Sequence, residues 1–210
     1  MDSNRACEIA GVIGQGGIVA SPTDTVYGLL ADAINEEAVK RLFELKRRPK
    51  SKPFLVLVNS IESARRFAGF TDEALEVVHH FWVKEKKPLT VVVPLLQCSE
   101  DYIAKSVTAG EATIAIRLPN HEPLLEIMEC LGRPVVAPSA NIHGQPQAMS
   151  YNDVIAAFGE EVPGISMVLD GGESRCLSAS TIVNLSRKPY TILREGSAQL
   201  NEIVEIVGLL

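Results

Sequence analysis

Hydroxyl, amide and cationic side chains are concentrated in four short segments, each next to an apolar run. The segments read SPTDTVYGL at 21–29, KRRPKSKPF at 46–54, APSAN at 137–141 and ILREG at 192–196. Hydroxyl and amide groups hydrogen-bond to phosphate or carboxylate oxygens, and arginine and lysine neutralise the charge of those oxygens. In open α/β sheets such groups meet where strands give way to loops, and small charged ligands bind there. The pattern predicts a site for a compact anion.

The densest segment carries five cations, namely Lys46, Arg47, Arg48, Lys50 and Lys52. One interpretation is a solvated helix end, because cations in a last turn complement the helix dipole. That interaction is worth only about 0.3–1 kcal/mol, too little to account for so many cations. A proline also ends the helix within the run, so the charges spread into a loop. We favour phosphate binding, because a polyphosphate would relieve the repulsion among these cations.

The hydroxyl and amide residues each admit two interpretations. Thr23, Thr25 and Tyr27 lie either in an ordinary turn or along a polar ligand pocket, and the two are compatible. Ser139 and Asn141 follow an apolar run and a proline. They form either a simple turn at a strand end or a phosphate site of hydroxyl and backbone N–H groups.

Two arginines complete the set of candidate residues. Arg194 is either a surface residue paired with Glu195 or a ligand contact. Arg117 interrupts the otherwise apolar strand pattern TIAIRLP. A buried arginine requires an anion, and we expect a ligand carboxylate to supply it.

Apolar spacing predicts alternating helices and strands around these segments. Helices are expected at 5–14, 36–48, 60–68, 72–82, 123–131, 150–158 and 197–207. Strands are expected at 18–20, 54–58, 89–93, 113–118, 135–137, 167–169, 181–185 and 191–193. Periods of 2 and 3.6 residues alternate without a long linker or repeat, so we expect one α/β domain over residues 1–210.

Composition narrows the class of protein. The formal charge of −6 over 210 residues argues against a surface that coats nucleic acid, although a tRNA contact by the basic loop stays open. No apolar run approaches the length of about 20 residues that spans a bilayer. The four cysteines (Cys7, Cys98, Cys130 and Cys176) are far apart and form no CxxC pair, so we expect reduced thiols and a cytoplasmic protein. The GxxxxGK[ST], GxGxxG, HExxH and GxSxG patterns are absent.

The segments also resemble a known family when taken together. SPTDTVYGL, Lys46-x-Arg48-Pro49, Ser139-x-Asn141, STIVNL at 180–185 and LREG at 193–196 occur in the order and spacing of the YrdC family. The resemblance runs from about Ile9 to Ala198, and the chain looks like the short, single-domain form. It implies a twisted mixed β-sheet flanked by helices, with a large concave basic cavity.

The best-known members of this family are threonylcarbamoyl-AMP synthases, so the resemblance implies a nucleotidyltransferase. Such an enzyme converts L-threonine, bicarbonate or CO₂, and ATP with Mg²⁺ into threonylcarbamoyl-adenylate and pyrophosphate. Other proteins then transfer the threonylcarbamoyl group to adenosine 37 of tRNA. Mg²⁺ would be carried largely by phosphate oxygens and water.

The family's site residues carry over by motif in two sets. Thr25, Arg117, Ser180 and the backbone of Ala137 fall where the family holds threonine. The residues that fall where it holds ATP are Arg48, Lys52, Thr113, Ser139, Asn141 and Arg194. Lys46 and Arg48 are the expected catalytic residues, which would stabilise charge on the phosphates. Many relatives have His where this chain has Leu57, so we expect one threonine contact to be missing or replaced.

The chemistry expected of these residues is positioning and charge neutralisation. No candidate nucleophile lies beside a base in the sequence, so we expect no covalent enzyme intermediate. Two alternatives stay open. A tRNA- or double-stranded-RNA-binding module would use the same loop, although its cations are few and lack an aromatic stacking platform. A carbamoyl-transfer domain like that of hydrogenase maturation factors would use carbamoyl phosphate, usually with acylphosphatase or zinc-finger segments.

Overall fold

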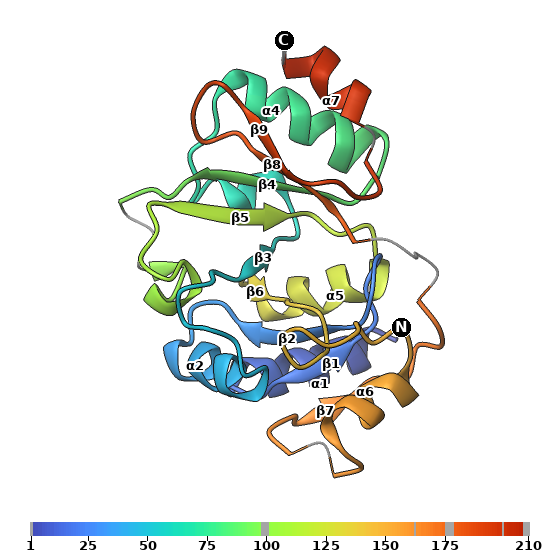
Figure 1. Ribbon diagram of the computed structural model, residues 1–210. Helices are drawn as coiled ribbons and strands as arrows, with labels where there is room; N and C mark the ends of the chain where they lie inside the picture. The colour runs from blue at the N-terminus through green and yellow to red at the C-terminus, as the bar shows by residue number, and fades with distance from the viewer. Residues whose placement is uncertain (1, 98–100, 162, 175–178, 199, 208–210) are drawn as a thin grey trace.

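The computed structural model describes residues 2–97, 101–161, 163–174, 179–198 and 200–207. Within them the strands form a nine-stranded sheet in the order β7-β1-β2-β6-β3-β5-β4-β8-β9 (Figure 1). The strands are β1 (Val19–Ser21), β2 (Gly28–Asp32), β3 (Leu55–Leu57), β4 (Leu89–Pro94), β5 (Thr113–Arg117), β6 (Val135–Val136), β7 (Met167–Val168), β8 (Thr181–Asn184) and β9 (Thr191–Arg194).

Helices pack against this sheet. The α-helices are α1 (Ser3–Gly14), α2 (Glu36–Leu45), α3 (Ile61–Ala64), α4 (Asp72–Val78), α5 (Glu122–Leu131), α6 (Tyr151–Phe158) and α7 (Leu200–Val207). A π-helical segment, η1 (His79–Lys84), continues α4, and η3 (Lys105–Val107) is a short 3₁₀ helix. α4 and α7 lie side by side at the top of Figure 1. None of the described helices has the length and apolar character needed to cross a bilayer.

The sheet is mixed, which confirms the predicted α/β fold class. The parallel pairs are β1–β7, β3–β5 and β4–β8. The antiparallel pairs are β1–β2, β2–β6, β3–β6, β4–β5 and β8–β9. Parallel neighbours require crossover connections, and each of these crossovers includes at least one helix.

Alternation along the strands gives the sheet two different faces. On β4, Leu89, Val91 and Val93 enter a core that also contains residues of α2 and α4. On β5, Ile114 and Ile116 enter the same core. The residues between them therefore point to the opposite face.

Helices α1 and α5 cover part of that opposite face. They form a second core with β1, β2 and β6, in which Ile9 and Ile127 meet Leu30 and Val135. Farther along the sheet, β3, β5, β4 and β8 turn the residues on this face toward a cavity instead. The site therefore lies beside the α1–α5 layer.

The expectation that the cysteines are reduced is wrong for two of them. Cys7 on α1 and Cys130 on α5 form a disulfide, with their Cα atoms 5.1 Å apart. This separation lies within the range that disulfides span. The two residues are 123 positions apart in the sequence, and their distance in space follows only from the packing of the two helices. Cys98 and Cys176 lie outside the described residues.

Local signals fix both ends of α2. Asn35 caps its first turn, where its Oδ1 accepts from the Ala38 N–H at 3.0 Å. At the other end the Arg47 N–H bonds to the Glu44 carbonyl and the Arg48 N–H bonds to the Phe43 carbonyl. This pair of bonds accompanies a left-handed residue just beyond a helix, and Arg47 has a φ of 49°. The helix ends earlier than predicted, so the cations lie in the loop rather than in the last turn.

Most other predicted elements are present, with two differences. The strand β2 was not predicted, because its five consecutive buried residues show no alternation. The helix expected at 60–68 is the single turn α3, which is followed by turns. A capping box of Ser150 and Asp153 begins α6. Helix α5 ends at Gly132, which has a φ of 67°.

Candidate active site

The four predicted segments converge on one cavity of about 550 Å³. The predicted residues that line it are Thr25, Lys46, Arg48, Lys52, Arg117, Ala137, Ser139, Asn141, Ser180 and Arg194. Thr113 begins β5 on the same side as Ala115, which lines the cavity, but Thr113 itself does not. Its contact with nucleotide stays a prediction.

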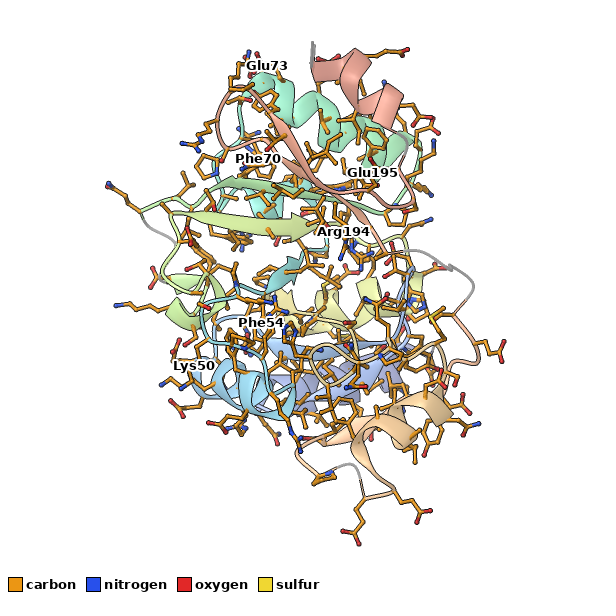
Figure 2. All side chains as sticks on the ribbon, in the orientation of Figure 1. Lys50, Phe54, Phe70, Glu73, Arg194 and Glu195 are labelled. Atoms are coloured by element: carbon orange, nitrogen blue, oxygen red, sulfur yellow. A yellow bond between two sulfur atoms is a disulfide. The ribbon has the colours of Figure 1, made fainter. Side chains whose placement is uncertain are left out.

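The basic segment divides into cavity residues and surface residues. Lys46, Arg48 and Lys52 line the cavity. Arg47 and Lys50 are exposed and do not line it. Figure 2 labels Lys50 near the edge of the molecule and Arg194 near the centre of the view.

The Lys46 side chain turns inward and is only 2% exposed. Its Nζ lies 2.5 Å from the Ser139 carbonyl oxygen, 2.7 Å from the Asn141 carbonyl oxygen and 3.0 Å from Asn141 Oδ1. Three acceptors match the three N–H donors of an ammonium group. Burial, helped by the charge of Arg48, lowers the pKa of Lys46 to about 7. An anion in the cavity would favour the charged form again.

Arg48 is held by backbone oxygens of its own loop. Its Nε donates to the Lys52 carbonyl at 3.1 Å and its Nη2 to the Pro53 carbonyl at 2.8 Å. The guanidinium carbon lies 5.2 Å from the centre of the Phe54 ring, which is a cation–π distance. These contacts fix the guanidinium at the cavity wall. Lys52 Nζ lies 3.1 Å from Nε2 of His143, another lining residue.

The loop that follows β6 is ordered by its own side chains. Ser139 Oγ donates to Asn141 Oδ1 at 2.7 Å, and Asn141 Nδ2 donates to the Gln145 carbonyl at 2.6 Å. The Ala140 N–H donates to the Tyr27 carbonyl at 2.7 Å. The loop is therefore tied to the 21–29 segment and presents its hydroxyl to the cavity.

A second polar cluster lies on β4, on β9 and at Ser180, just before β8. Arg194 donates to the Ser180 carbonyl from Nε at 3.0 Å and from Nη2 at 2.8 Å, and Nη2 also donates to Ser180 Oγ at 3.1 Å. Ser180 Oγ lies 2.8 Å from Thr90 Oγ1. Arg194 thus turns toward the cavity, which favours the ligand-contact interpretation.

Arg117 has an anion within the chain, contrary to our expectation that a ligand would supply it. Its Nη1 lies 3.1 Å from Oδ1 of Asp24, and both side chains are buried. The same nitrogen donates to Thr25 Oγ1 at 3.3 Å. The sequence does not identify Asp24 as this partner, because a buried pair so far apart in the chain leaves no local pattern.

Leu57 lies beside Arg117, its partner in the parallel register of β3 and β5. It is fully buried in the core with α1 and α5 and does not line the cavity. The loss of a threonine contact at this position stays a prediction. Thr90 also lines the cavity, and sequence reasoning identified it only as part of a strand.

Comparison with known proteins identifies the family. Residues 11–196 match the Sua5/YciO/YrdC model, whose description is "Telomere recombination". The chain belongs to this family, as its motifs predicted.

The chain is similar to proteins named threonylcarbamoyl-AMP synthase. It is 39% identical to the threonylcarbamoyl-AMP synthase of Pyrococcus abyssi over 200 residues. This alignment covers 95% of this chain and 56% of the relative. It is 33% identical to the Bacillus subtilis protein of the same name over 205 residues, and the alignment covers 97% of this chain and 57% of that relative. The chain therefore spans a little over half the length of these relatives. A putative threonylcarbamoyl-AMP synthase of Mycobacterium tuberculosis is 32% identical, with 95% and 87% covered.

Solved structures show the same fold. The crystal structure of P. abyssi Sua5 complexed with L-threonine matches with a TM-score of 0.90 and 37% identity, covering 100% of this chain and 59% of that one. The E. coli YciO structure matches with a TM-score of 0.80 at 15% identity, covering 96% and 94%. The latter likeness concerns the fold alone.

Proposed function

We propose that this protein is a threonylcarbamoyl-AMP synthase. It would join L-threonine, bicarbonate and ATP into L-threonylcarbamoyladenylate and release pyrophosphate. Relatives named for this activity, and the likeness to a Sua5 structure complexed with L-threonine, support the proposal.

The observation that carries the proposal is a single cavity lined by two groups of polar side chains, one suited to phosphates and one to an amino acid. Arg48, Lys52 and Ser139 are suited to phosphates, and Arg117 and Ser180 to an amino acid, and all line the same space. Its volume lies within the range of small-molecule sites. Two reactants held in one space react as if at very high concentration.

The proposed reaction needs positioning more than proton transfer by side chains. The threonine amine forms a bond to the carbon of bicarbonate, and water leaves, giving a carbamate. A carbamate oxygen then attacks the α-phosphorus of ATP, the bond to the bridging oxygen breaks, and pyrophosphate departs. Arg48, Lys52 and Arg194 would neutralise the charge that develops on the phosphates.

The amino acid would be held by Arg117, Thr25 and Ser180. The guanidinium would pair with the threonine carboxylate, because arginine matches the geometry of a carboxylate. The two hydroxyl groups would bind its other polar atoms. Ala137 would contribute backbone contacts.

Mg²⁺ would enter with ATP as part of the substrate. Within the described residues there is no group of three or more His, Cys, Asp or Glu that could hold a metal ion. Phosphate oxygens and water are ligands that Mg²⁺ prefers. The product is a mixed anhydride, which water hydrolyses. A tRNA-modifying transferase would therefore have to bind the product before it is hydrolysed.

Pyrophosphate release tests the proposal. Purified protein receives ATP, L-threonine and ¹³C-labelled bicarbonate, each omitted in turn, and mass spectrometry identifies the adenylate. We expect pyrophosphate and labelled product only in the complete mixture. Salt-sensitive RNA retention without pyrophosphate release would instead indicate the RNA-binding alternative.

A further inference from the structure

Asp24 is a buried charge that the proposed reaction does not use. Its side chain is 6% exposed, and that of its partner Arg117 is 3% exposed. Arg117 lines the cavity, whereas Asp24 does not. Asp24 therefore contacts Arg117 on the side that faces away from the cavity where a ligand would bind.

The Asp24 carboxylate is itself fixed. Its Oδ2 accepts a hydrogen bond from the backbone N–H of Asn120 at 3.2 Å, just before α5 begins. His121 follows, and burial lowers the pKa of its imidazole, against a smaller opposite effect of Asp24. A neutral imidazole leaves Arg117 as the cation that balances Asp24.

The neighbouring hydroxyls hold the other side of the same guanidinium. Thr25 Oγ1 accepts from Arg117 at 3.3 Å and lies 3.0 Å from Thr23 Oγ1. Thr23 Oγ1 in turn donates to the Val26 carbonyl at 2.8 Å. Asp24 and Thr25 thus both contact the Arg117 guanidinium. They belong to one short segment, and the hydrogen bonds within this segment fix its conformation.

The positive charge of a second arginine at this end of the cavity explains why Arg117 needs contacts that fix its orientation. Burial lowers the pKa of Arg194, and the positive charge of Arg117 lowers it further, so the two guanidiniums repel each other. Loss of Asp24 would remove the anion that opposes this repulsion and would weaken the hold on the orientation of Arg117. An arginine recognises a carboxylate through a planar fork, so its orientation decides whether both N–H groups reach the ligand.

We propose that Asp24 is a positioning residue that holds the Arg117 guanidinium in the orientation that receives the carboxylate of the amino-acid substrate. This inference rests on the proposed function, because it assigns Arg117 to that carboxylate. It concerns a residue outside the cavity that acts through a residue inside it.

Substitution of Asp24 separates positioning from simple charge balance. Asp24→Asn keeps the shape and removes the charge. We expect the KM for threonine to rise by about tenfold, because a displaced binding group costs affinity, while the KM for ATP stays within about twofold. Asp24→Glu keeps the charge and should restore part of the threonine affinity. If Asp24 only opposed the ligand carboxylate, the KM for threonine would fall in Asp24→Asn, and the inference would be wrong.

A double-mutant cycle tests whether Asp24 acts through Arg117. Arg117→Gln alone should weaken threonine binding. In that background Asp24→Asn should have no further effect on the KM for threonine, since the group it positions is gone. Independent, multiplicative effects of the two substitutions would overturn the proposal.

Two controls keep the outcomes distinguishable. Unfolding temperatures identify a variant that fails to fold. If Asp24→Asn fails to fold, Asp24→Glu serves as the test variant: a threonine KM above that of the wild type, with the KM for ATP unchanged, supports the positioning role, and a threonine KM equal to that of the wild type contradicts it. Wild-type protein is assayed first: absence of pyrophosphate release contradicts the proposed function itself. An active wild type together with an unaltered Asp24→Asn contradicts only the role of Asp24.

Discussion

The Lys46 ammonium nitrogen lies 2.7 Å from the carbonyl oxygen of Asn141 and 3.0 Å from its side-chain oxygen. The two residues are 95 positions apart in the sequence. This contact joins the basic loop to the loop after β6. The two segments proposed to bind phosphates therefore form one unit, and the position of Ser139 depends on a lysine.

Replacement of Lys46 should disorder this unit. In Lys46→Met three acceptors lose this donor. Asn141 Oδ1 keeps the Ser139 hydroxyl and the Ser139 carbonyl keeps the Asn141 N–H, so the Asn141 carbonyl loses most. A buried acceptor left unsatisfied costs about 1–3 kcal/mol. We expect kcat/KM for ATP to fall by more than about tenfold, together with a lower unfolding temperature. Pyrophosphate release and thermal unfolding measure the two effects. Near-normal turnover would show that the loop keeps its shape without the lysine.

ATP binding should be coupled to proton uptake. Because the pKa of Lys46 is lowered to about 7 in the free protein, much of the amine is neutral above that pH. Phosphates in the cavity would raise this pKa, so binding takes up a proton and ATP affinity falls as pH rises above about 7. Calorimetry in two buffers with different ionisation enthalpies measures the uptake. Equal heats in both buffers, or the same uptake in Lys46→Met, would contradict the assignment.

Arg48 and Arg47 form a matched pair for testing the phosphate role. Arg48 lines the cavity, and its neighbour is exposed to solvent. Arg48→Ala should lower turnover by more than about tenfold, because a charge on the phosphates is lost. Arg47→Ala should leave turnover nearly unchanged although it removes the same charge from the same loop. Equal losses in the two variants would indicate that only the overall charge matters.

The left-handed backbone of Arg47 gives a separate prediction about stability. A residue with a side chain at a φ of 49° is strained, whereas glycine adopts this conformation freely. Arg47→Gly should therefore raise the free energy of unfolding by up to about 1 kcal/mol. Urea unfolding measures the change. A loss of stability would show that the side chain makes a contact that outweighs the strain.

Reduction of the disulfide should destabilise the protein without stopping catalysis. Closing a loop of this length stabilises a folded chain by about 2–4 kcal/mol. Cys7 and Cys130 are exposed and lie outside the cavity lining. We expect dithiothreitol to lower the unfolding temperature of the wild type and to have no effect on a variant with Cys7→Ser and Cys130→Ser. Turnover at moderate temperature should be the same with and without reductant.

The elements predicted most accurately are those whose signals are local. The spacing of Ile9, Ala10 and Ile13 predicts α1, and Gly132 predicts the end of α5. The fully buried strand β2 carries no periodic pattern and was missed. The early end of α2 depends on Arg47 adopting a conformation that usually requires glycine, and the sequence gives no sign of it.

The site was predictable in its composition and not in its contacts. Residue types at strand ends identified the cavity lining, because hydroxyls and cations there have few structural reasons to cluster. The partners could not be predicted: Asp24 for Arg117, Thr90 for Ser180 and Asn141 for Lys46 are all brought together by the fold. Thr90 is a polar residue in an apolar strand pattern, as Arg117 is, and this local signal could have identified it as a site residue.

Ser180 and Arg194 reach the cavity from the end of the sheet formed by β8 and β9, where β9 is the outermost strand. Outer strands open more readily than central ones, since they have a partner on one side only. Ligands bound by Ser180 and Arg194 would stabilise the packing of β8 and β9 against β4. Amide hydrogens of β9 should then exchange with deuterium more slowly when ATP and threonine are present, while those of the remote helix α6 keep their rates. Slower opening of this sheet edge would thus report that the cavity is occupied.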